Sequence, residues 1–233
     1  MNALIYGIFL QWKLDIRSKN MLITCYLVPL LFFAVMGGIF TSIMPETKDT
    51  LIPAMTVFGV SMGSLIGLPP SLAEIYGSSI QNVYKANQVP IWLGAVLTNL
   101  SAAIHLFLMS LILYAAAPAL FDAAFPEHPL EYFGGLVVFI LSFLALASVA
   151  GILVKDLSKL SCVSILLFLP SILFSGIMFP LRLLPSVFQT VGKLFPATWG
   201  YELMSGCSFA LIALLLIFFA ASALCALAIK QKR

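Results

Sequence analysis

Long runs of apolar residues separated by short polar segments make up most of this chain. A bilayer core about 30 Å thick needs roughly 20 apolar residues for each helical span. The runs are long and uncharged rather than short and alternating, which favours helices over a barrel. The pattern therefore predicts an all-α integral membrane protein with six transmembrane helices, at residues 21–43, 51–68, 90–117, 132–154, 160–179 and 207–229.

Residues 1–20 show a different pattern, that of an amphipathic helix lying in the membrane interface. Lys13 and Arg17 lie roughly opposite an apolar stripe. That stripe contains Leu4, Ile5, Ile8, Phe9, Trp12 and Ile16. No cation precedes the apolar part and no small-residue cleavage site follows it, so we expect this segment to remain attached rather than to act as a removable signal peptide.

Residues 174–200 are apolar but cannot form one continuous helix, because Pro180, Pro185 and Pro196 interrupt them. Broken backbone at membrane depth is tolerated only when it is buried in protein or lines a wet cavity. We therefore predict an external re-entrant hairpin over residues 180–205, before the last span, with Arg182 and Lys193 reaching toward the outer surface. A plain interfacial loop remains the alternative.

Composition agrees with the membrane class and orients the chain. Hydrophobic residues make up 62% of the 233 residues and charged residues 9%, and the mean hydropathy is +1.10, whereas a soluble domain is about 25% charged. Six spans put both termini on the same side of the membrane, and most cations lie on that side. The positive-inside rule makes this side cytoplasmic. These cations are Lys13, Arg17, Lys19, Lys85, Lys155, Lys159, Lys230, Lys232 and Arg233. Lys48, Arg182 and Lys193 lie on the other side, together with the acidic loop at 118–131.

The chain shows no motif for metal or nucleotide binding. Cys25, Cys162, Cys207 and Cys225 lie in or beside apolar segments without a CxxC pair or a nearby His, so we expect neither disulfides nor a zinc site. No G-x-x-x-x-G-K-[ST] sequence occurs, so any ATP and Mg²⁺ would bind to another polypeptide. The cations flank the spans and give no indication of nucleic-acid binding.

The run LPSILFSGIMFPLRLLPSVFQTVGKLFPATW at 169–199 resembles the segment after the fifth span of type-two permeases, the transmembrane subunits of ATP-binding cassette (ABC) exporters. The matching positions are Pro170, Ser175, Gly176, Phe179, Pro180, Leu184, Pro185, Phe195 and Pro196. The interfacial N-terminal helix, the six spans and the C-terminal cations extend this resemblance over essentially the whole chain.

The resemblance implies a multi-pass permease in the plasma membrane of a bacterium, with residues 1–20 as a connecting helix and residues 21–233 as the permease domain. It also implies a homodimer with two ATPase subunits docked beneath it, and transport out of the cell. Spans two and five would line the pathway, and its candidate residues are Phe58, Ser61, Met62, Ser164, Phe168 and Ser171. Phe and Met walls with sparse hydroxyls suit an amphipathic or lipid-like cargo such as a drug, peptide or lipid.

For an ATPase to drive the spans, a rigid cytoplasmic piece must contact it, and residues 72–88 are the candidate coupling segment. Leu72, Ile75, Ile80, Val83 and Tyr84 can anchor a short helix there. The candidate contact residues are Glu74, Tyr76, Gly77, Gln81 and Lys85. A solvated loop is the alternative.

Two further features lie inside the predicted spans. Gly59, Gly63 and Gly67 follow a GxxxGxxxG spacing, which allows another helix to approach closely. His105 lies in the third span and shares a helix face with Thr98 and Ser101. We expect an interhelical hydrogen bond there; a protonation site on the substrate pathway is the sharper alternative.

Functions from other classes are less well supported. GVSMG at 59–63 matches G-x-S-x-G with Ser61 as nucleophile and His105 as a conceivable base, but the nucleophile elbow requires a strand, a turn and a helix rather than the inside of an apolar span. A channel, or an ATP-independent structural subunit, is the other alternative. Channels usually show a polar span face or a carbonyl-rich filter, and neither is evident here.

Overall fold

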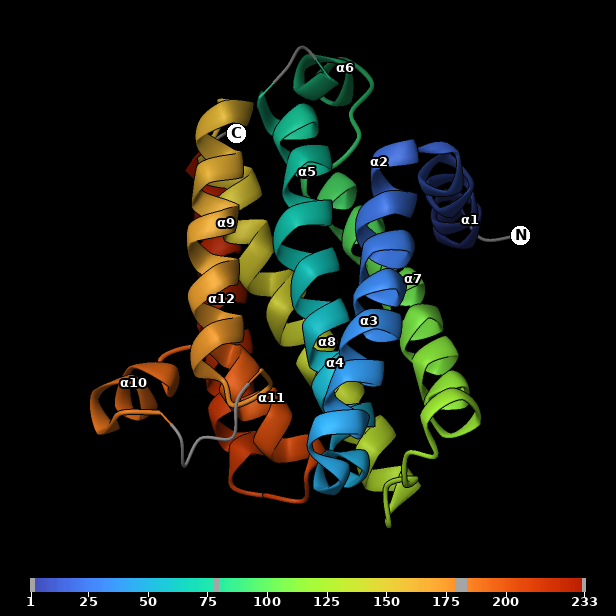
Figure 1. The fold of residues 1–233 in the computed structure, drawn as a ribbon. Coiled ribbons are helices and arrows are strands. Elements are labelled where there is room, and N and C mark those ends of the chain that lie inside the picture. The colour runs from blue at the N-terminus through green and yellow to red at the C-terminus, as the bar shows by residue number, and fades with distance from the viewer. Residues whose placement is uncertain (1–2, 78–79, 179–183, 232–233) are drawn as a thin grey trace.

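The molecule is a bundle of six membrane-spanning helices (Figure 1), which confirms the all-α membrane class. The computed structural model describes residues 3–77, 80–178 and 184–231, and none of these residues forms a β-strand. The six helices long and apolar enough to cross a membrane are Ile23–Ile43, Leu51–Gly77, Trp92–Phe121, Pro129–Leu153, Leu157–Phe174 and Ala210–Gln231, here called spans 1 to 6.

Several of these spans consist of more than one helical element. The first half of the chain contains α1 (Ala3–Arg17), α2 (Lys19–Leu22), η1 (Ile23–Leu27), α3 (Val28–Ile43), η2 (Pro45–Asp49), α4 (Leu51–Met62), η3 (Gly63–Gly67), α5 (Leu68–Gly77) and α6 (Ile80–Ala86). The second half contains α7 (Trp92–Phe121), α8 (Pro129–Leu153), α9 (Leu157–Phe174), α10 (Ser186–Gly192), α11 (Pro196–Met204) and α12 (Ala210–Gln231). The elements η1 and η3 are single π-helical turns inside spans 1 and 2, and they contact each other.

The ends of spans 2, 3 and 5 differ most from the predicted ones, and span 5 ends at Phe174 rather than at the predicted residue 179. Span 2 does not stop before Pro69 but continues to Gly77, because the wider π turn η3 directly precedes the two proline rings and gives them room. Span 3 passes through Pro118 and ends at Phe121, where Asp122 takes a left-handed conformation with φ of 51°. A proline therefore does not mark the C-terminal end of span 2 or of span 3.

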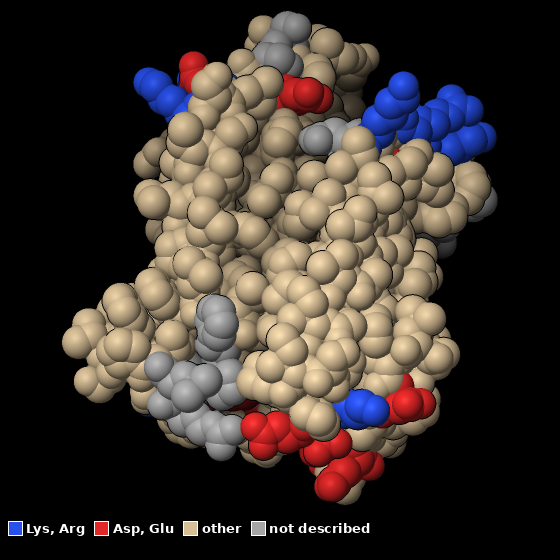
Figure 2. Space-filling model, in the orientation of Figure 1, with Lys and Arg blue, Asp and Glu red and all other residues tan. Residues whose placement is uncertain are grey.

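The two ends of the bundle carry different charges. Both termini, α1 and α6 lie at one end, here called the terminal end (Figure 1). On the face drawn in Figure 2, most cations lie at that end, where acidic side chains also occur, most acidic residues lie at the opposite end, and no charged side chain is visible in the band between them. Lys48, which lies at the acidic end, pairs with Asp122 at 3.7 Å. An uncharged band between two charged ends is the arrangement that a bilayer requires.

Span 2 is the centre of the bundle. In its most apolar 18-residue stretch 89% of the residues are buried, against 17% in span 6. Its elements contact α3, α7, α8, α9 and α11. Span 2 therefore positions most of the other elements, and span 6 lies at the periphery.

Helix α1 packs against α7, with Gly7 beside Leu97. The predicted apolar stripe coincides only partly with the face of α1 that packs against the rest of the bundle. Phe9 and Ile16 of the stripe are exposed, whereas Asp15 is buried. The apolar residues on the exposed side suit contact with lipid, as expected for an interfacial helix. The protein-facing side is the one that carries the carboxylate.

The segment between spans 5 and 6 forms two short helices. Span 5 ends at Phe174, and Gly176 then turns the chain with φ of 85°. Helix α10 contacts α9, and Phe188 stacks on Phe174 with ring centroids 5.0 Å apart. Helix α11 packs on α8 and α12, where Gly200 lies against Phe139. Arg182 lies outside the described residues, and the re-entrant hairpin stays a prediction.

Candidate transport pathway and coupling segment

Three phenylalanines bring spans 1, 2 and 5 together in what we call the aromatic junction. The rings of Phe32 and Phe58 stack with centroids 3.8 Å apart, and Phe58 meets Phe168 edge-on at 5.8 Å. Phe58 and Phe168 are both buried. Two of the predicted pathway residues thus lie in contact, and Phe32 joins them from a helix that the prediction did not include. Stacked and edge-on rings are favourable arrangements that fix the relative positions of the helices.

The remaining predicted pathway residues are mostly turned into the protein. Ser164 is buried, and the buried Ser171 donates its hydroxyl hydrogen to the Leu167 carbonyl at 2.6 Å. The buried Ser61 hydroxyl has no hydrogen-bond partner among the described residues. Met62 is half-buried. The hydroxyls therefore line no open cavity in this conformation.

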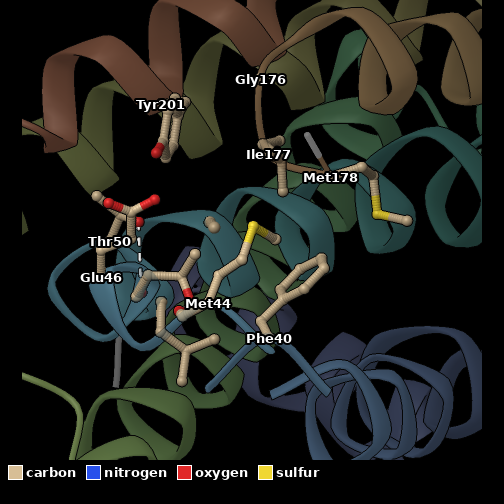
Figure 3. A pocket seen from close by; sticks show the side chains of 11 residues that line it. Phe40, Met44, Glu46, Thr50, Gly176, Ile177, Met178 and Tyr201 are labelled. Atoms are coloured by element: carbon tan, nitrogen blue, oxygen red, sulfur yellow. Dashed lines mark hydrogen bonds between the residues drawn. The ribbon is translucent and has the colours of Figure 1, made fainter. Parts of the chain in front are cut away.

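A pocket of about 230 Å³ lies at the end of the bundle opposite the termini, here called the outer pocket. In Figure 3 the side chains of Tyr201 and Ile177 approach it from one side and those of Phe40 and Met44 from the other. Glu46 adds a carboxylate to the lining. The pocket is thus mainly apolar with a few polar groups, the usual character of a site for an amphipathic ligand.

The outer pocket and the aromatic junction follow each other along span 2. Ala54 lines the pocket and Phe58 belongs to the junction. Four residues of helix separate them, a rise of about 6 Å. Spans 1 and 2 contribute to both features, since Phe40 lies on span 1, and Gly176 adds the segment that follows the end of span 5 at Phe174. Sequence reasoning missed the pocket, because Ser175 and Gly176 were placed inside a fifth span predicted to run over residues 160–179.

The coupling segment differs from the predicted short helix. Its first part is α5, the straight continuation of span 2, in which Leu72 and Tyr76 are buried. The Tyr76 hydroxyl donates to the Ile91 carbonyl at 2.8 Å, so this side chain braces the start of span 3. Glu74 and Gly77 are exposed at the terminal end.

The second part of the coupling segment is α6, which contains Gln81 and Lys85. Ile80 and Val83 were expected to anchor this helix, but both are exposed. Tyr84 is the half-buried member, and its hydroxyl lies close to Gly94 of α7. The Tyr84 ring therefore places α6 beside the start of α7, while the side chains of Ile80 and Val83 are not buried.

The glycine stripe of span 2 faces spans 1 and 3. A Cβ atom added to Gly59 would lie 2.5 Å from Cε of Met109, and one added to Gly67 would lie 2.9 Å from Oγ1 of Thr24. At Gly63 it would meet Leu106 and lie 3.2 Å from Sγ of Cys25. The backbone of span 2 is thus in direct contact with its neighbours, which only glycine permits.

His105 is buried and bonds to Tyr26 of span 1, with Nδ1 2.8 Å from the hydroxyl oxygen. The two residues expected beside it have other partners: Thr98 donates to the Gly94 carbonyl, and Ser101 donates to Asp15 at 2.5 Å. The geometry is that of an interhelical hydrogen bond.

The carboxylate of Asp15 was not predicted at this place. Its oxygens accept from Ser101 of α7 and from Gln11 of α1, which lies one turn earlier on the same helix. Trp12 of α1 stacks on the His105 ring with centroids 6.0 Å apart. The signal in the sequence was the i, i+4 spacing of Gln11 and Asp15, which puts two polar residues on one face of this amphipathic helix.

Ser61 does not occupy a nucleophile elbow, because it lies inside α4 rather than at a strand-to-helix turn. The His105 ring bonds to Tyr26 through Nδ1. No group of three His, Cys, Asp or Glu side chains among the described residues could hold a metal ion. Cys25, Cys162, Cys207 and Cys225 are free thiols.

The described chain consists of six candidate membrane spans preceded by the helix α1, which packs against α7. The family model described as ABC-2 type transporter matches residues 7–209. The match covers most of the chain, so the chain belongs to the ABC-2 type transporter family. The resemblance drawn from residues 169–199 is thereby confirmed. Membership implies a permease subunit that associates with ABC ATPase subunits and with a membrane. A comparison with curated proteins finds no match.

Proposed function

We propose that this chain is the permease of an ABC exporter that moves an amphipathic or lipid-like substrate, such as a drug, peptide or lipid, out of the cytoplasm. The observation that carries the proposal is the succession of aromatic junction and outer pocket along span 2. The junction consists of Phe rings, and the pocket combines apolar side chains such as Phe40 and Met44 with the Glu46 carboxylate and with hydroxyls, those of Thr47, Thr50 and Tyr201. Walls of this mixed character favour an amphipathic cargo.

In this proposal the terminal end faces the cytoplasm of a bacterial cell, and the outer pocket is the exit. Support comes from the cations gathered at the terminal end, which the positive-inside rule makes the cytoplasmic end (Figure 2). Two ATPase subunits, which bind ATP and Mg²⁺, dock at the terminal end. A second copy of this chain completes the pathway as a homodimer, because spans 1 and 5 leave most of their surface unburied in one copy.

The decisive experiment is copurification of the permease with a cassette ATPase, followed by ATP turnover and transport in reconstituted vesicles. We expect amphipathic cargo to stimulate ATP turnover. Phe58→Ala, which opens the aromatic junction, should lower this stimulation more than Phe219→Ala, which removes an exposed ring from span 6. Transport of small ions without ATP would instead establish the channel.

A second experiment tests the coupling role of residues 72–88. Glu74 is exposed at the terminal end, where an ATPase would dock. Glu74→Lys should leave ATP turnover in place while transport falls, because the motor no longer engages span 2. Lys193→Glu, a charge reversal next to α10 near the opposite end, is the matched control. An equal ratio of transport to ATP turnover in the two variants would show that Glu74 does not contact the ATPase.

A further inference from the structure

A second cavity lies between spans 3, 4 and 6. It is a groove of about 470 Å³ that includes none of the residues of the aromatic junction or the outer pocket. Its walls are residues 92–103 of α7, 141–152 of α8 and 218–229 of α12. Trp92, Val96 and Leu100 of its lining are well exposed, so the groove opens to the surroundings of the bundle. At this depth those surroundings are lipid.

The length of the groove matches one leaflet. Each wall covers eleven residue steps along a helix, a rise of about 16 Å. One half of a hydrocarbon core is about 15 Å thick. Span 3 starts at the terminal end with Trp92, and spans 4 and 6 finish there, so the groove occupies the half of the bilayer nearest the terminal end. An acyl chain of that leaflet has the required length and polarity.

The walls of the groove are held at fixed spacing by polar contacts between the helices. The Ser148 hydroxyl of α8 donates to Oδ1 of Asn99 on α7 at 3.0 Å. The Cys225 thiol of α12 contacts the Ala145 carbonyl of α8 at 3.6 Å. An asparagine at membrane depth is costly unless it is bonded, so this link is a built feature of the groove. A groove with fixed walls is already formed before a ligand arrives.

The groove has an aromatic residue and a cation at its mouth. Trp92 lines the end nearest the terminal end, the depth at which indole rings favour the membrane interface. On α12 the lining residues Ser222 and Ala226 are four apart, and Lys230 continues the same stripe by four more. An ammonium group at the interface attracts an anionic lipid headgroup. No acidic residue contributes to the lining.

We propose that this groove binds an anionic phospholipid of the leaflet at the terminal end, with one acyl chain between α7, α8 and α12 and the phosphate beside Lys230. The site needs neither ATP nor cargo, so it does not depend on the proposed transport function. The bound lipid fills the space between three spans, and its headgroup is selected by charge.

The test measures contact between lipid chains and Trp92 in the full chain reconstituted in vesicles. Trp12→Phe and Trp199→Phe leave Trp92 as the reporter, since the chain has three tryptophans. Brominated acyl chains quench indole fluorescence by contact. In one titration brominated phosphatidylglycerol is added to phosphatidylcholine vesicles, and in the other brominated phosphatidylcholine is added to phosphatidylglycerol vesicles. We expect brominated phosphatidylglycerol to reach half-maximal quenching at a lipid fraction roughly fivefold lower than brominated phosphatidylcholine does.

Matched variants separate the groove from the general lipid boundary. Ala226→Phe fills the groove, whereas Ala220→Phe changes an equally exposed alanine of α12 that does not line it. Lys230→Gln removes the cation, and Lys159→Gln removes one on another helix at the same end. We expect Ala226→Phe and Lys230→Gln to abolish the preference for phosphatidylglycerol, with a ratio of about one between the two lipids. The two controls should keep it.

Three results would overturn the proposal. Equal quenching by the two lipids at every fraction would mean that the groove takes boundary lipid without selecting it. An undiminished preference in Ala226→Phe would place the selective site elsewhere. Absence of quenching by either lipid would mean that protein, such as a second copy of this chain, covers the groove.

Discussion

Spans 2 and 6 are both apolar, yet one lies at the centre of the bundle and the other at its edge. Span 2 contains three closely packed glycines and several buried hydroxyls, among them Thr56 and Ser61. Span 6 is rich in Leu and Phe side chains, and residues such as Leu216 and Phe219 are exposed. Lipid is as apolar as leucine, so hydrophobicity does not drive a helix toward the centre of a membrane protein.

The comparison teaches that close packing of small residues, rather than apolar character, determines which helix is central here. Small residues let spans 1 and 3 approach the backbone of span 2, and the large side chains of span 6 face outward instead. Substitutions of the same kind should therefore have different effects on the two helices.

The largest difference is expected for one truncation made in each helix. Leu65 of span 2 is 1% exposed and Leu216 of span 6 is 66% exposed. Leu65→Ala should lower the free energy of unfolding by about 2–5 kcal/mol because it leaves a cavity. Leu216→Ala should change it by less than about 0.5 kcal/mol. Denaturant unfolding in detergent micelles measures both, and equal losses would remove the distinction between centre and edge.

A substitution at the glycine stripe tests close packing directly. Gly63→Val places new atoms against Leu106 and Cys25, so spans 1 and 3 must move away from span 2. We expect a loss of about 1–3 kcal/mol in the free energy of unfolding. The control is Gly134→Ala in span 4, where nothing lies within 4 Å; it should stabilise the helix by about 0.5–1 kcal/mol.

A buried polar pair tests the contribution of hydrogen bonding at the centre. The hydroxyls of Thr56 and Tyr132 join spans 2 and 4 at 2.8 Å, and both residues are buried. Thr56→Val leaves the tyrosine hydroxyl unpaired, which should cost about 1–3 kcal/mol. Adding Tyr132→Phe removes that orphaned group, so the double variant should be more stable than the sum of the single losses indicates. Strict additivity in thermal unfolding would show that the bond contributes nothing.

The smallest effect is expected at the end of a peripheral helix. Asp156 caps span 5 by accepting from the Lys159 backbone N–H at 2.9 Å. Asp156→Ala should cost about 1 kcal/mol. Asp156→Asn retains an accepting oxygen and should remain near the parent protein. A loss as large as that of Leu65→Ala would mean that span 5 is more central than its burial indicates.

The spans and the family could be predicted because both depend on local signals. Long apolar runs determine the spans, and the motif around Gly176 and Pro185 carries the resemblance. Helix ends at prolines were predicted less well, since the π turn before Pro69 has no marker in hydropathy. Both termini also lie at one end, as six spans require.

The candidate site was less predictable because it depends on contacts between distant segments. The prediction named Phe58 and Phe168 but not Phe32, which stacks on Phe58 from another span. The buried contact between Asp15 and Ser101 joins residues 86 positions apart. The outer pocket and the groove combine residues of several helices, and only their three-dimensional arrangement brings these residues together.

The paired π turns of spans 1 and 2 have a consequence for how the length of this chain can change. A π turn holds one residue more than the α turn it replaces. Loss of one residue from Gly63–Gly67 would therefore return that turn to α geometry and leave the flanking faces of span 2 aligned with their neighbours. The same loss within α4 or α5 would rotate the remainder of the helix by about 100°. Deletion of a single residue in this permease should accordingly be tolerated at these two turns and rejected one turn away.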